Sequence, residues 1–352
     1  MQPFLCECGN VLFFDNSKCL QCGLDVGFDP AQLRMVVLNT NGPFRRCGNG
    51  LKYNVCNWVL PTTALGDLCI ACVLNRTIPD LTNKRNLMLW GRMESAKRRL
   101  ICTLLRLGFS LPSLKDDPKT GLAFDIVSAI SDPKATMGHL NGVITVNLEE
   151  ADDTYRQINR EQLGESSRTL LGHFRHETGH YVWQRWVGPL MWNDPLRDAL
   201  RSCFGDERFD YTTALAAHYK NGAPSGWEQS FISAYATSHP WEDWAETWAH
   251  YLQILEGQEA CDSLGLDLRH LSLPVAPFPA DAGQLPNMLP QSAEADNAFL
   301  VWLHRWVCLS TVLNEIASSL GQPTLYPFVL SVGVARKLRL VHHLVKLWGG
   351  RQ

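Results

Sequence analysis

Close pairs of cysteines near the N-terminus constrain the fold of this chain more than any other feature. The sequence holds twelve cysteines, and eight of them lie within the first 72 residues. Cys6 and Cys8 form one pair, and Cys19 and Cys22 form another after a ten-residue loop; glycine follows each pair. Paired thiolates followed by glycine are typical of the tight turns of a zinc ribbon. We therefore expect these four cysteines to bind one zinc ion.

A second group of cysteines follows with a looser spacing. Cys69 and Cys72 form a tight pair, whereas Cys47 and Cys56 are spread along the chain. We expect these four to bind a second zinc ion. The surrounding sequence is rich in Cys, Gly and Asn and has little helical periodicity, which is typical of a loop-rich module organised by metal.

The first residues, the length of the apolar runs and the remaining cysteines indicate the cellular compartment that we expect. The first residues lack the basic and apolar pattern of a secretory signal, and no apolar run reaches about 18 residues. We therefore expect a cytoplasmic protein with reduced thiols and no membrane partner. Four scattered cysteines are expected to be small buried hydrophobic residues: Cys102, Cys203, Cys261 and Cys308.

Charge argues against nucleic acid as a partner of the cysteine-rich module. Residues 1–80 hold six Lys and Arg against six Asp and Glu, and the whole chain has a net charge of −3. Each zinc ion bound by four thiolates adds about two negative charges. The module thus lacks the basic surface that binds phosphate, and we expect structural zinc, with a protein partner or autoregulation as its possible further role.

Composition divides the chain into three regions. We expect a zinc-ribbon module with two four-cysteine sites at 1–78 and a catalytic domain at 79–270. A Pro- and Ala-rich linker at 271–294 then leads into C-terminal helices, so the third region is 271–352 and packs on the second. Hydrophobic residues make up 45% of the chain, which suffices for a large core.

Periodicity predicts mixed helices and strands. The pattern predicts strands at 124–130 and 142–148, and a helix from Met93 to Leu107 that ends at Gly108. Further helices are predicted at 166–186, 207–220, 225–236, 241–255, 295–319 and 332–347.

The motif that indicates catalytic chemistry is His176-Glu177-Thr178-Gly179-His180. Histidines four apart project from one face of a helix, so both imidazoles can bind one zinc ion. Glu177 lies beside them, where it can take a proton from a water molecule and later return it.

A chance match must be considered, because this pattern arises in roughly one chain in a hundred of this length. The context favours a functional motif. Leu170, Leu171, Phe174 and Tyr181 give the predicted helix a face to bury. The strand predicted at Val143–Leu148 also precedes it, and we expect this to be an edge strand that docks substrate.

Zinc needs another protein ligand, and the sequence offers candidates downstream. The third histidine that metzincins carry is absent, because Trp183 and Trp186 occupy the continuation of the motif. We therefore expect a carboxylate from a second helix. Glu242 and Glu246, which follow Pro240 at a helix start, share one face of such a helix.

We favour Glu242 as the zinc ligand and Glu246 as the acceptor of the spare N–H of a zinc-bound histidine. Two glutamates at this spacing are more often a solvated face, but tryptophans are unusually frequent on this helix. We expect Trp241, Trp244 and Trp248 to face the core. Competing ligands remain in a nearby acidic segment: Asp206, Glu207 and Asp210.

At this point the sequence resembles the gluzincin peptidases. The closest likeness is to the lethal-factor type, in which a tyrosine precedes a Glu-x-x-Ala-Glu helix by seven residues. Most of the chain also resembles a bacterial family of zinc-binding metallopeptidases with an N-terminal zinc ribbon. The matching stretches are Arg76-Thr-Ile-Pro-Asp80, Gly142-Val-Ile-Thr-Val-Asn147, His173-Phe-Arg-His-Glu-Thr-Gly-His180, Gly205-Asp-Glu-Arg208, Ser238-His-Pro-Trp-Glu-Asp-Trp-Ala-Glu-Thr-Trp-Ala-His250 and Leu325-Tyr-Pro-Phe-Val-Leu-Ser331.

The resemblance implies a role for Tyr235, whose hydroxyl would stabilise the oxyanion of the tetrahedral intermediate. A helix-end aromatic residue packed in the core is the alternative. His173 shares the motif's face, but a structural histidine is more common there, and we assign no role to His239 or His250. The resemblance implies no substrate beyond a peptide or protein.

Together these features predict an α+β chain: a zinc-ribbon module, a zincin-like metallopeptidase domain and C-terminal helices. We expect peptide hydrolysis with one catalytic and two structural zinc ions. The main alternative is a non-catalytic, zinc-stabilised protein-binding module with a vestigial motif. Retention of Glu177 argues against it, because a structural site needs no base. A hydrolase of non-peptide amides is a further alternative.

Overall fold

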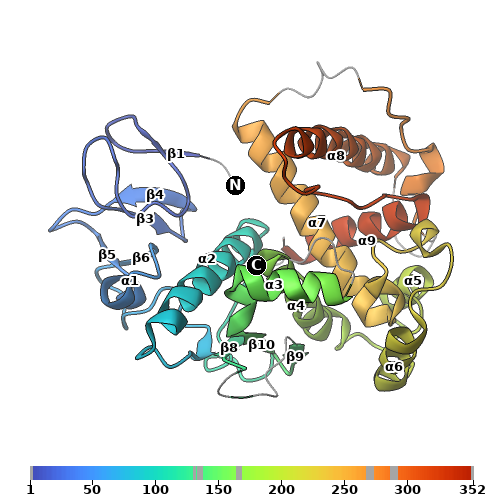
Figure 1. Ribbon diagram of the computed structural model, residues 1–352, viewed down its shortest axis with the longest axis horizontal. Coiled ribbons are helices and arrows are strands. Elements are labelled where there is room, and N and C mark those ends of the chain that lie inside the picture. Colours follow the sequence, from blue (N-terminus) through green and yellow to red (C-terminus); the bar gives the residue numbers. More distant parts are fainter. Residues whose placement is uncertain are drawn as a thin grey trace. The chain divides into compact units, whose positions relative to one another are not determined.

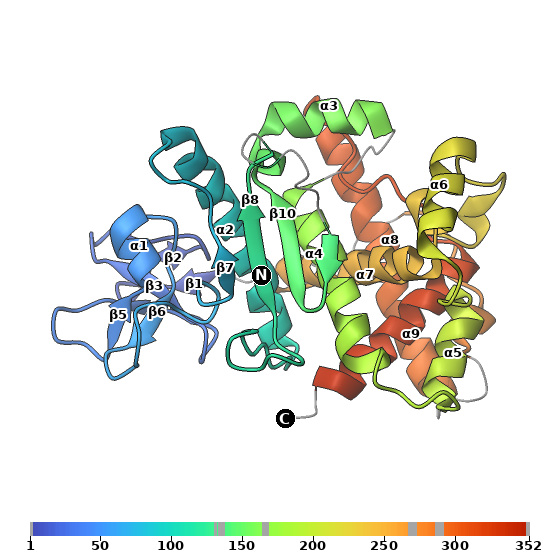
Figure 2. The same cartoon turned by 90° about the horizontal axis from the view of Figure 1, so that it is seen from below.

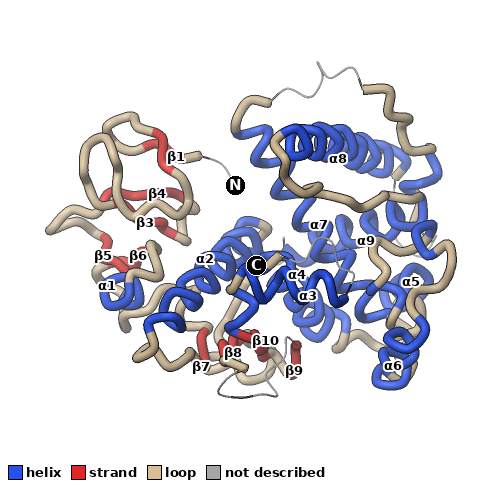
Figure 3. Tube along the Cα trace, viewed as in Figure 1, coloured by secondary structure: helices blue, strands red, loops and turns tan. Residues whose placement is uncertain are grey.

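A computed structural model describes residues 3–129, 132, 138–163, 169–266, 273–285 and 292–349. The chain forms two compact units. The first unit consists of the described residues up to Phe174 together with Gly349 near the C-terminus. The second unit runs from Arg175 to Trp348. Every strand among the described residues lies in the first unit, whereas helices and loops make up the described part of the second (Figure 3). The predicted α+β class is confirmed.

The N-terminal part of the first unit consists of short hairpins and loops (Figure 1). The antiparallel pairs are β1 (Phe4–Leu5) with β2 (Val11–Leu12), β3 (Val26–Asp29) with β4 (Arg34–Val37), and β5 (Phe44–Arg46) with β6 (Val59–Pro61). The short helix α1 (Gly48–Tyr53) lies between β5 and β6 along the chain. An aromatic cluster fills the centre of the hairpins. The ring of Phe28 lies 4.8 Å from that of Phe14 and 5.2 Å from that of Trp58. So small an apolar core explains why metal would be needed to stabilise these hairpins.

A four-stranded sheet follows in the order β7-β8-β10-β9 (Figure 2). The strands are β7 (Asn75–Thr77), β8 (Ala123–Val127), β9 (Gly138–Leu140) and β10 (Val143–Asn147). β8 pairs in parallel with both β7 and β10, while β9 runs antiparallel to β10. The predicted strands at 124–130 and 142–148 correspond to β8 and β10.

The prediction that Val143–Leu148 forms an edge strand is wrong. β10 lies between β8 and β9, so the outer position belongs to β9. Asn141 and Gly142 join the two strands with φ of 50° and 79°. An Asn-Gly pair with both φ values positive is the preferred turn of a two-residue hairpin. This dipeptide was the sequence signal for β9.

Helix α2 (Lys84–Arg106) begins nine residues before the predicted start. The Asn83 side chain accepts a hydrogen bond from the backbone N–H of Arg85 and so caps its first turn. Asn86 and Gly91 have low helix propensity and weaken the helical pattern of these first turns, so the turns were not predicted from the sequence. The predicted end is confirmed, because Gly108 takes a φ of 82° just beyond the helix.

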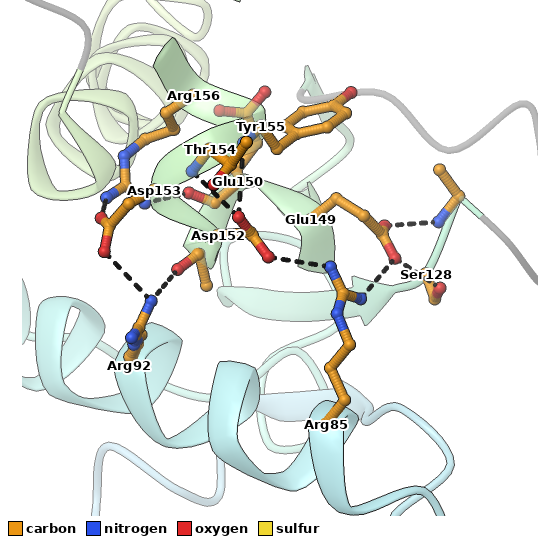
Figure 4. Close-up of polar contacts among 12 residues, drawn as sticks. Arg85, Arg92, Ser128, Glu149, Glu150, Asp152, Asp153, Thr154, Tyr155 and Arg156 are labelled. Carbon is orange, nitrogen blue, oxygen red and sulfur yellow. Dashed lines mark hydrogen bonds and ion pairs between the residues drawn. The ribbon is translucent and has the colours of Figure 1, made fainter. Parts of the chain in front are cut away.

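Polar contacts fix α2 to the segment after β10 (Figure 4). Arg85 forms ion pairs with Glu149 at 3.8 Å and Asp152 at 3.0 Å, and Arg92 donates to the carbonyl of Ala151 at 3.0 Å. Glu149 also accepts a hydrogen bond from Ser128 after β8 at 2.8 Å. These contacts therefore link α2, the carboxyl ends of β8 and β10, the 3-10 helix Leu148–Ala151 and α3 (Asp153–Leu163).

Helix α4 (Leu170–Val182) continues as a π-helical turn, Trp183–Val187, in agreement with the described part of the predicted helix 166–186. The second unit then contains α5 (Pro195–Phe204), α6 (Tyr211–Asn221), α7 (Pro240–Ser263), α8 (Ala293–Ser319) and α9 (Val332–Gly349). The last three confirm predicted helices, although α7 extends eight residues beyond the predicted end. α5 was not predicted.

The helix predicted at 225–236 is wrong. Only 3-10 turns form there, at Trp227–Gln229 and Tyr235–Thr237. Gly226 has a φ of 75°, and the Ser233 hydroxyl accepts from the backbone N–H of Ala236 at 3.1 Å. Serine hydrogen bonds of this kind compete with helix formation.

Buried ion pairs support the core of the second unit. Lys337 on α9 contacts Asp243 on α7 at 2.6 Å, and Arg339 contacts Asp296 on α8 at 2.8 Å. Trp244 and Trp248 are fully buried as predicted, but Trp241 is 37% exposed. None of the helices formed by the described residues combines the length, low charge and hydropathy that a membrane span needs.

Candidate metal centres

Three groups of metal-ligating side chains converge in the part of the chain that the structure describes. The first comprises Cys6, Cys8, Cys19 and Cys22, whose sulfur atoms all lie within 4.8 Å of one another. The sulfurs of Cys6 and Cys22 are 3.7 Å apart, as are those of Cys8 and Cys19. Four thiolates around a tetrahedral zinc ion lie about 3.8 Å apart, so the group fits this metal.

The second group comprises Cys47, Cys56, Cys69 and Cys72, again within 4.8 Å of one another. All four are buried, whereas Cys8 and Cys22 of the first group are exposed. The sulfurs of Cys56 and Cys69 are 3.7 Å apart, and the backbone N–H of Cys69 donates to the sulfur of Cys47 at 3.4 Å.

A buried ion pair on α2 adjoins this second group. Lys97 contacts Glu94 at 2.8 Å, and both side chains are 0% exposed. Glu94 lies 3.8 Å from the sulfur of Cys72 and accepts a hydrogen bond from the indole of Trp90 at 3.1 Å. The positive Lys97 offsets the negative charge of the carboxylate and of the nearby thiolates.

The third group joins two helices of the second unit, because His176 and His180 lie on α4 and Glu242 lies on α7. The Nε2 atoms of the two histidines are 3.2 Å apart. From Glu242, Oε2 lies 3.0 Å from Nε2 of His176 and Oε1 lies 3.5 Å from Nε2 of His180. Donors bound to a tetrahedral zinc ion at its usual distances are about 3.3 Å apart, so these residues fit zinc.

Small residues within the motif allow the two helices to approach closely. A Cβ atom on Gly179 would lie 2.9 Å from Cα of Ala245, so only glycine fits there. The indole N–H groups of Trp244 and Trp248 donate to the carbonyl of Gly179 at 2.8 Å and to the hydroxyl of Thr178 at 3.3 Å. These contacts place the acidic face of α7 opposite the two histidines.

Glu246 and Ser233 orient the first histidine. Nδ1 of His176 lies 2.7 Å from Oε1 of Glu246, which also accepts from the Ser233 hydroxyl at 2.6 Å through Oε2. A carboxylate on Nδ1 fixes the proton there and leaves Nε2 free to bind a metal. The structure therefore brings Glu246 to the position expected from the sequence.

The charged groups of the site shift one another's pKa values. Burial lowers the pKa of His176, but the nearby carboxylates of Glu242 and Glu246 outweigh this and raise it well above its usual value. Burial raises the pKa of Glu242, yet the two histidines hold it well below its usual value. Both shifts follow from the close approach of two imidazoles to two carboxylates in a buried site.

Glu177 and Tyr235 lie beside the same histidines. Glu177 is 7% exposed, and its Oε2 is buried without a hydrogen-bond partner among the described residues. Burial raises the pKa of this carboxyl group, an effect that the histidines partly offset. The ring of Tyr235 is 6.0 Å from that of His176, and burial together with Glu242 raises the pKa of its hydroxyl.

The competing acidic residues have other partners. Glu207 accepts from Arg197 at 3.0 Å and from Arg201 at 2.6 Å, and Asp206 pairs with Arg208. The carboxylate of Asp210 caps α6 by accepting from the backbone N–H of Thr213 at 2.7 Å. Their roles are therefore explained without a metal.

Sequence reasoning missed Tyr211, whose hydroxyl donates to Oε1 of Glu242 at 2.9 Å. Its only sequence signal was its place just after the acidic segment. The histidines without an assigned role have structural contacts. His239 caps α7, His250 lies 3.0 Å from the Tyr326 hydroxyl, and His173 lies 3.7 Å from Glu150.

Comparisons with known proteins agree with the resemblance noted in the sequence. The family model described as "Putative zinc-binding metallo-peptidase" matches residues 86–344, and a zinc-ribbon domain model matches residues 3–83. Uncharacterized proteins of Mycobacterium bovis and of two Mycobacterium tuberculosis strains are 40% identical over 346 residues, covering 98% of this chain and 95% of theirs. No solved structure matches the chain. The chain belongs to the zinc-binding metallo-peptidase family and carries its N-terminal zinc ribbon.

Proposed function

We propose that this chain is a gluzincin-type peptidase that hydrolyses peptide bonds with one catalytic zinc ion. One observation carries the proposal. His176, His180 and Glu242 converge with the donor spacing of a tetrahedral zinc site, and a buried glutamate from the same motif lies beside them. Three protein ligands leave a fourth position for water or substrate, which is the arrangement of catalytic zinc.

In this proposal, His176, His180 and Glu242 would hold the zinc ion, which would supply Lewis-acid activation of the scissile carbonyl and of a water molecule. Glu177 accepts a proton from this water molecule and then delivers it to the leaving nitrogen. The Tyr235 hydroxyl donates a hydrogen bond to the oxygen that gains negative charge. Glu246 keeps His176 in the tautomer that binds metal, and Ser233 holds Glu246.

The thiolate groups complete the proposal. Each would hold a structural zinc ion, giving three ions per chain, and reduced paired thiols favour a reducing compartment such as the cytoplasm. The zinc ribbons would contact a protein partner rather than nucleic acid.

A non-catalytic binding module is the second candidate. The complete His, His and Glu ligand set of the third group would then hold a structural ion. The buried carboxylate of Glu177 argues against this, because burying a base costs stability and adds nothing to a structural site.

The test is turnover of a peptide library by the zinc-loaded protein and by Glu177→Gln. We expect cleavage by the wild type and a loss of about 10²–10⁴-fold in the variant, because general-base catalysis is removed while the zinc ligands remain. Glu228→Gln, which changes an exposed glutamate of the same unit, should keep full activity.

Zinc content measured on the same samples separates the two functions. Equal zinc in both proteins with cleavage only by the wild type supports the peptidase. No cleavage of any library peptide by a fully loaded wild type favours the binding module.

A further inference from the structure

Helix α6 has none of its residues buried, yet its first residue reaches the third metal centre. Tyr211 is 36% exposed, and its hydroxyl donates to Oε1 of Glu242, a residue that is 1% exposed. Because no residue of α6 is buried, this hydroxyl contributes to the surroundings of the Glu242 carboxylate more than to packing of the core. The hydrogen bond therefore affects which oxygen of Glu242 is free to bind a metal ion.

The two oxygens of Glu242 have different surroundings. Oε1 accepts from Tyr211, whereas Oε2 is buried and accepts no hydrogen bond from the described residues. Oε2 is also the nearer to Nε2 of His176, at 3.0 Å. A hydroxyl on Oε1 thus leaves Oε2 as the free donor and disfavours binding through both oxygens.

The segment before Tyr211 is fixed at two points. Glu207, which is 8% exposed, binds Arg197 and Arg201 of α5. The carbonyl of Phe209 lies 3.0 Å from Nε2 of His239. These contacts give residues 205–211 a defined path to the start of α7.

The tautomer of His239 follows from its two contacts. Its Nδ1 accepts from the backbone N–H of Trp241 at 3.1 Å and so carries no proton. Nε2 is therefore protonated and donates to the Phe209 carbonyl. The same histidine thus caps α7 and holds the segment that carries Tyr211, which ties the tyrosine to the helix of its carboxylate partner.

We propose that Tyr211 is a positioning residue that holds Glu242 so that only Oε2 binds zinc. This inference rests on the proposed zinc site. It assigns the segment Gly205-Asp-Glu-Arg208 the role of anchoring this tyrosine rather than of binding metal. Binding through one oxygen leaves a coordination position open, which a catalytic site needs.

The experiment compares zinc affinity in the full-length wild type and in Tyr211→Phe, which removes the hydroxyl and keeps the ring. A mild chelator first empties the His and Glu centre, and zinc is then returned in competition with a fluorescent chelator. We expect the affinity of this site to fall about tenfold, as is usual when the partner of a metal ligand is lost. Tyr53→Phe, a tyrosine of the cysteine-rich part, is the matched control and should bind as the wild type does.

Cobalt placed in the emptied centre gives a second readout that general loss of stability would not produce. The visible absorption of Co²⁺ weakens when coordination rises above four. We expect weaker absorption in Tyr211→Phe, because the released Oε1 can also bind the metal.

Three outcomes would overturn the inference in distinguishable ways. Equal affinities and equal cobalt spectra would exclude a positioning role and leave the proposed peptidase intact. Loss of zinc from all three centres would show a general effect on folding instead of a role at Glu242. A wild type that binds no metal at this centre would overturn both the inference and the proposed function.

Discussion

The buried cysteine centre and the histidine–glutamate centre differ in how their ligands are supplied. Cys47, Cys56, Cys69 and Cys72 come from one segment of 26 residues, are all buried and offer four donors. His176, His180 and Glu242 come from two packed helices, and the histidines remain partly exposed. Four donors close a zinc site, whereas three leave it open. The difference is consistent with our proposal that the first kind of centre stabilises the fold and the second serves catalysis.

The distinction between the two centres would fail if a cysteine ligand could be removed without loss of stability. Cys47→Ser removes a buried thiolate from a segment with a small apolar core. We expect a loss on the order of 5 kcal/mol in the stability of the N-terminal part, because structural zinc supplies much of its folding free energy. Limited proteolysis and thermal unfolding would measure it, and His176→Ala should leave the same part resistant. Equal protease sensitivity of both variants would contradict the distinction.

Local features of both centres could be predicted from the sequence. The cysteine spacing predicted both thiolate groups, and the helical spacing of the motif predicted the two histidines. Glu242 and Glu246 were predicted from their own spacing on a second helix that follows Pro240. Spacing suffices to group residues within one helix or one cysteine-rich segment, whereas Glu242 was chosen because zinc needs a further ligand and a carboxylate from a second helix could supply it. The expected domain boundaries at residues 78 and 270 stay predictions.

Local caps and turns, and one tertiary contact, were not predicted from the sequence. The early start of α2, the unexpected α5 and the outer position of β9 depend on capping and turns that compete with periodicity. Tyr211 could not be linked to Glu242 because 31 residues and two helix boundaries separate them. The failed helix at 225–236 depends on Ser233, whose hydrogen bonds serve Glu246 and Ala236 instead of a helix.

The ion pair beside the buried cysteine centre sharpens the comparison. Lys97→Met leaves Glu94 charged and buried next to Cys72, and we expect a loss of about 3–5 kcal/mol in the free energy of unfolding. Chemical denaturation would measure it. The double variant Glu94→Gln/Lys97→Met should recover part of the loss, because no unpaired charge remains. A single variant as stable as the wild type would show that the pair is not needed.

Stability should also respond to pH through a histidine of the second unit. Burial lowers the pKa of His250 to about 4, so the folded chain keeps it neutral while the unfolded chain protonates it near pH 6.5. The unfolding free energy should be unaffected above pH 6.5 and should fall by up to about 3 kcal/mol as the pH drops to 4. Denaturation at several pH values would show this slope, and His250→Gln should flatten it. An unchanged slope in the variant would assign the effect to other groups.

The smallest expected effect separates the two thiolate centres from each other. Cys8 and Cys22 are exposed, whereas every ligand of the second group is buried. We expect a chelator to remove zinc first from the histidine–glutamate centre, then from the exposed thiolates and last from the buried ones, with rates differing about tenfold or more at each step. Absorbance of a metal-binding dye would follow the release. Release of all zinc in one phase would mean that the centres are equivalent.

Zinc content tests the central claim most directly, through elemental analysis of the wild type and of His176→Ala/His180→Ala. We predict about three zinc ions per chain in the wild type and about two in the double variant, from two four-thiolate sites and one histidine–glutamate site. Equal zinc content in the two proteins would contradict the account, because the motif would then bind no metal.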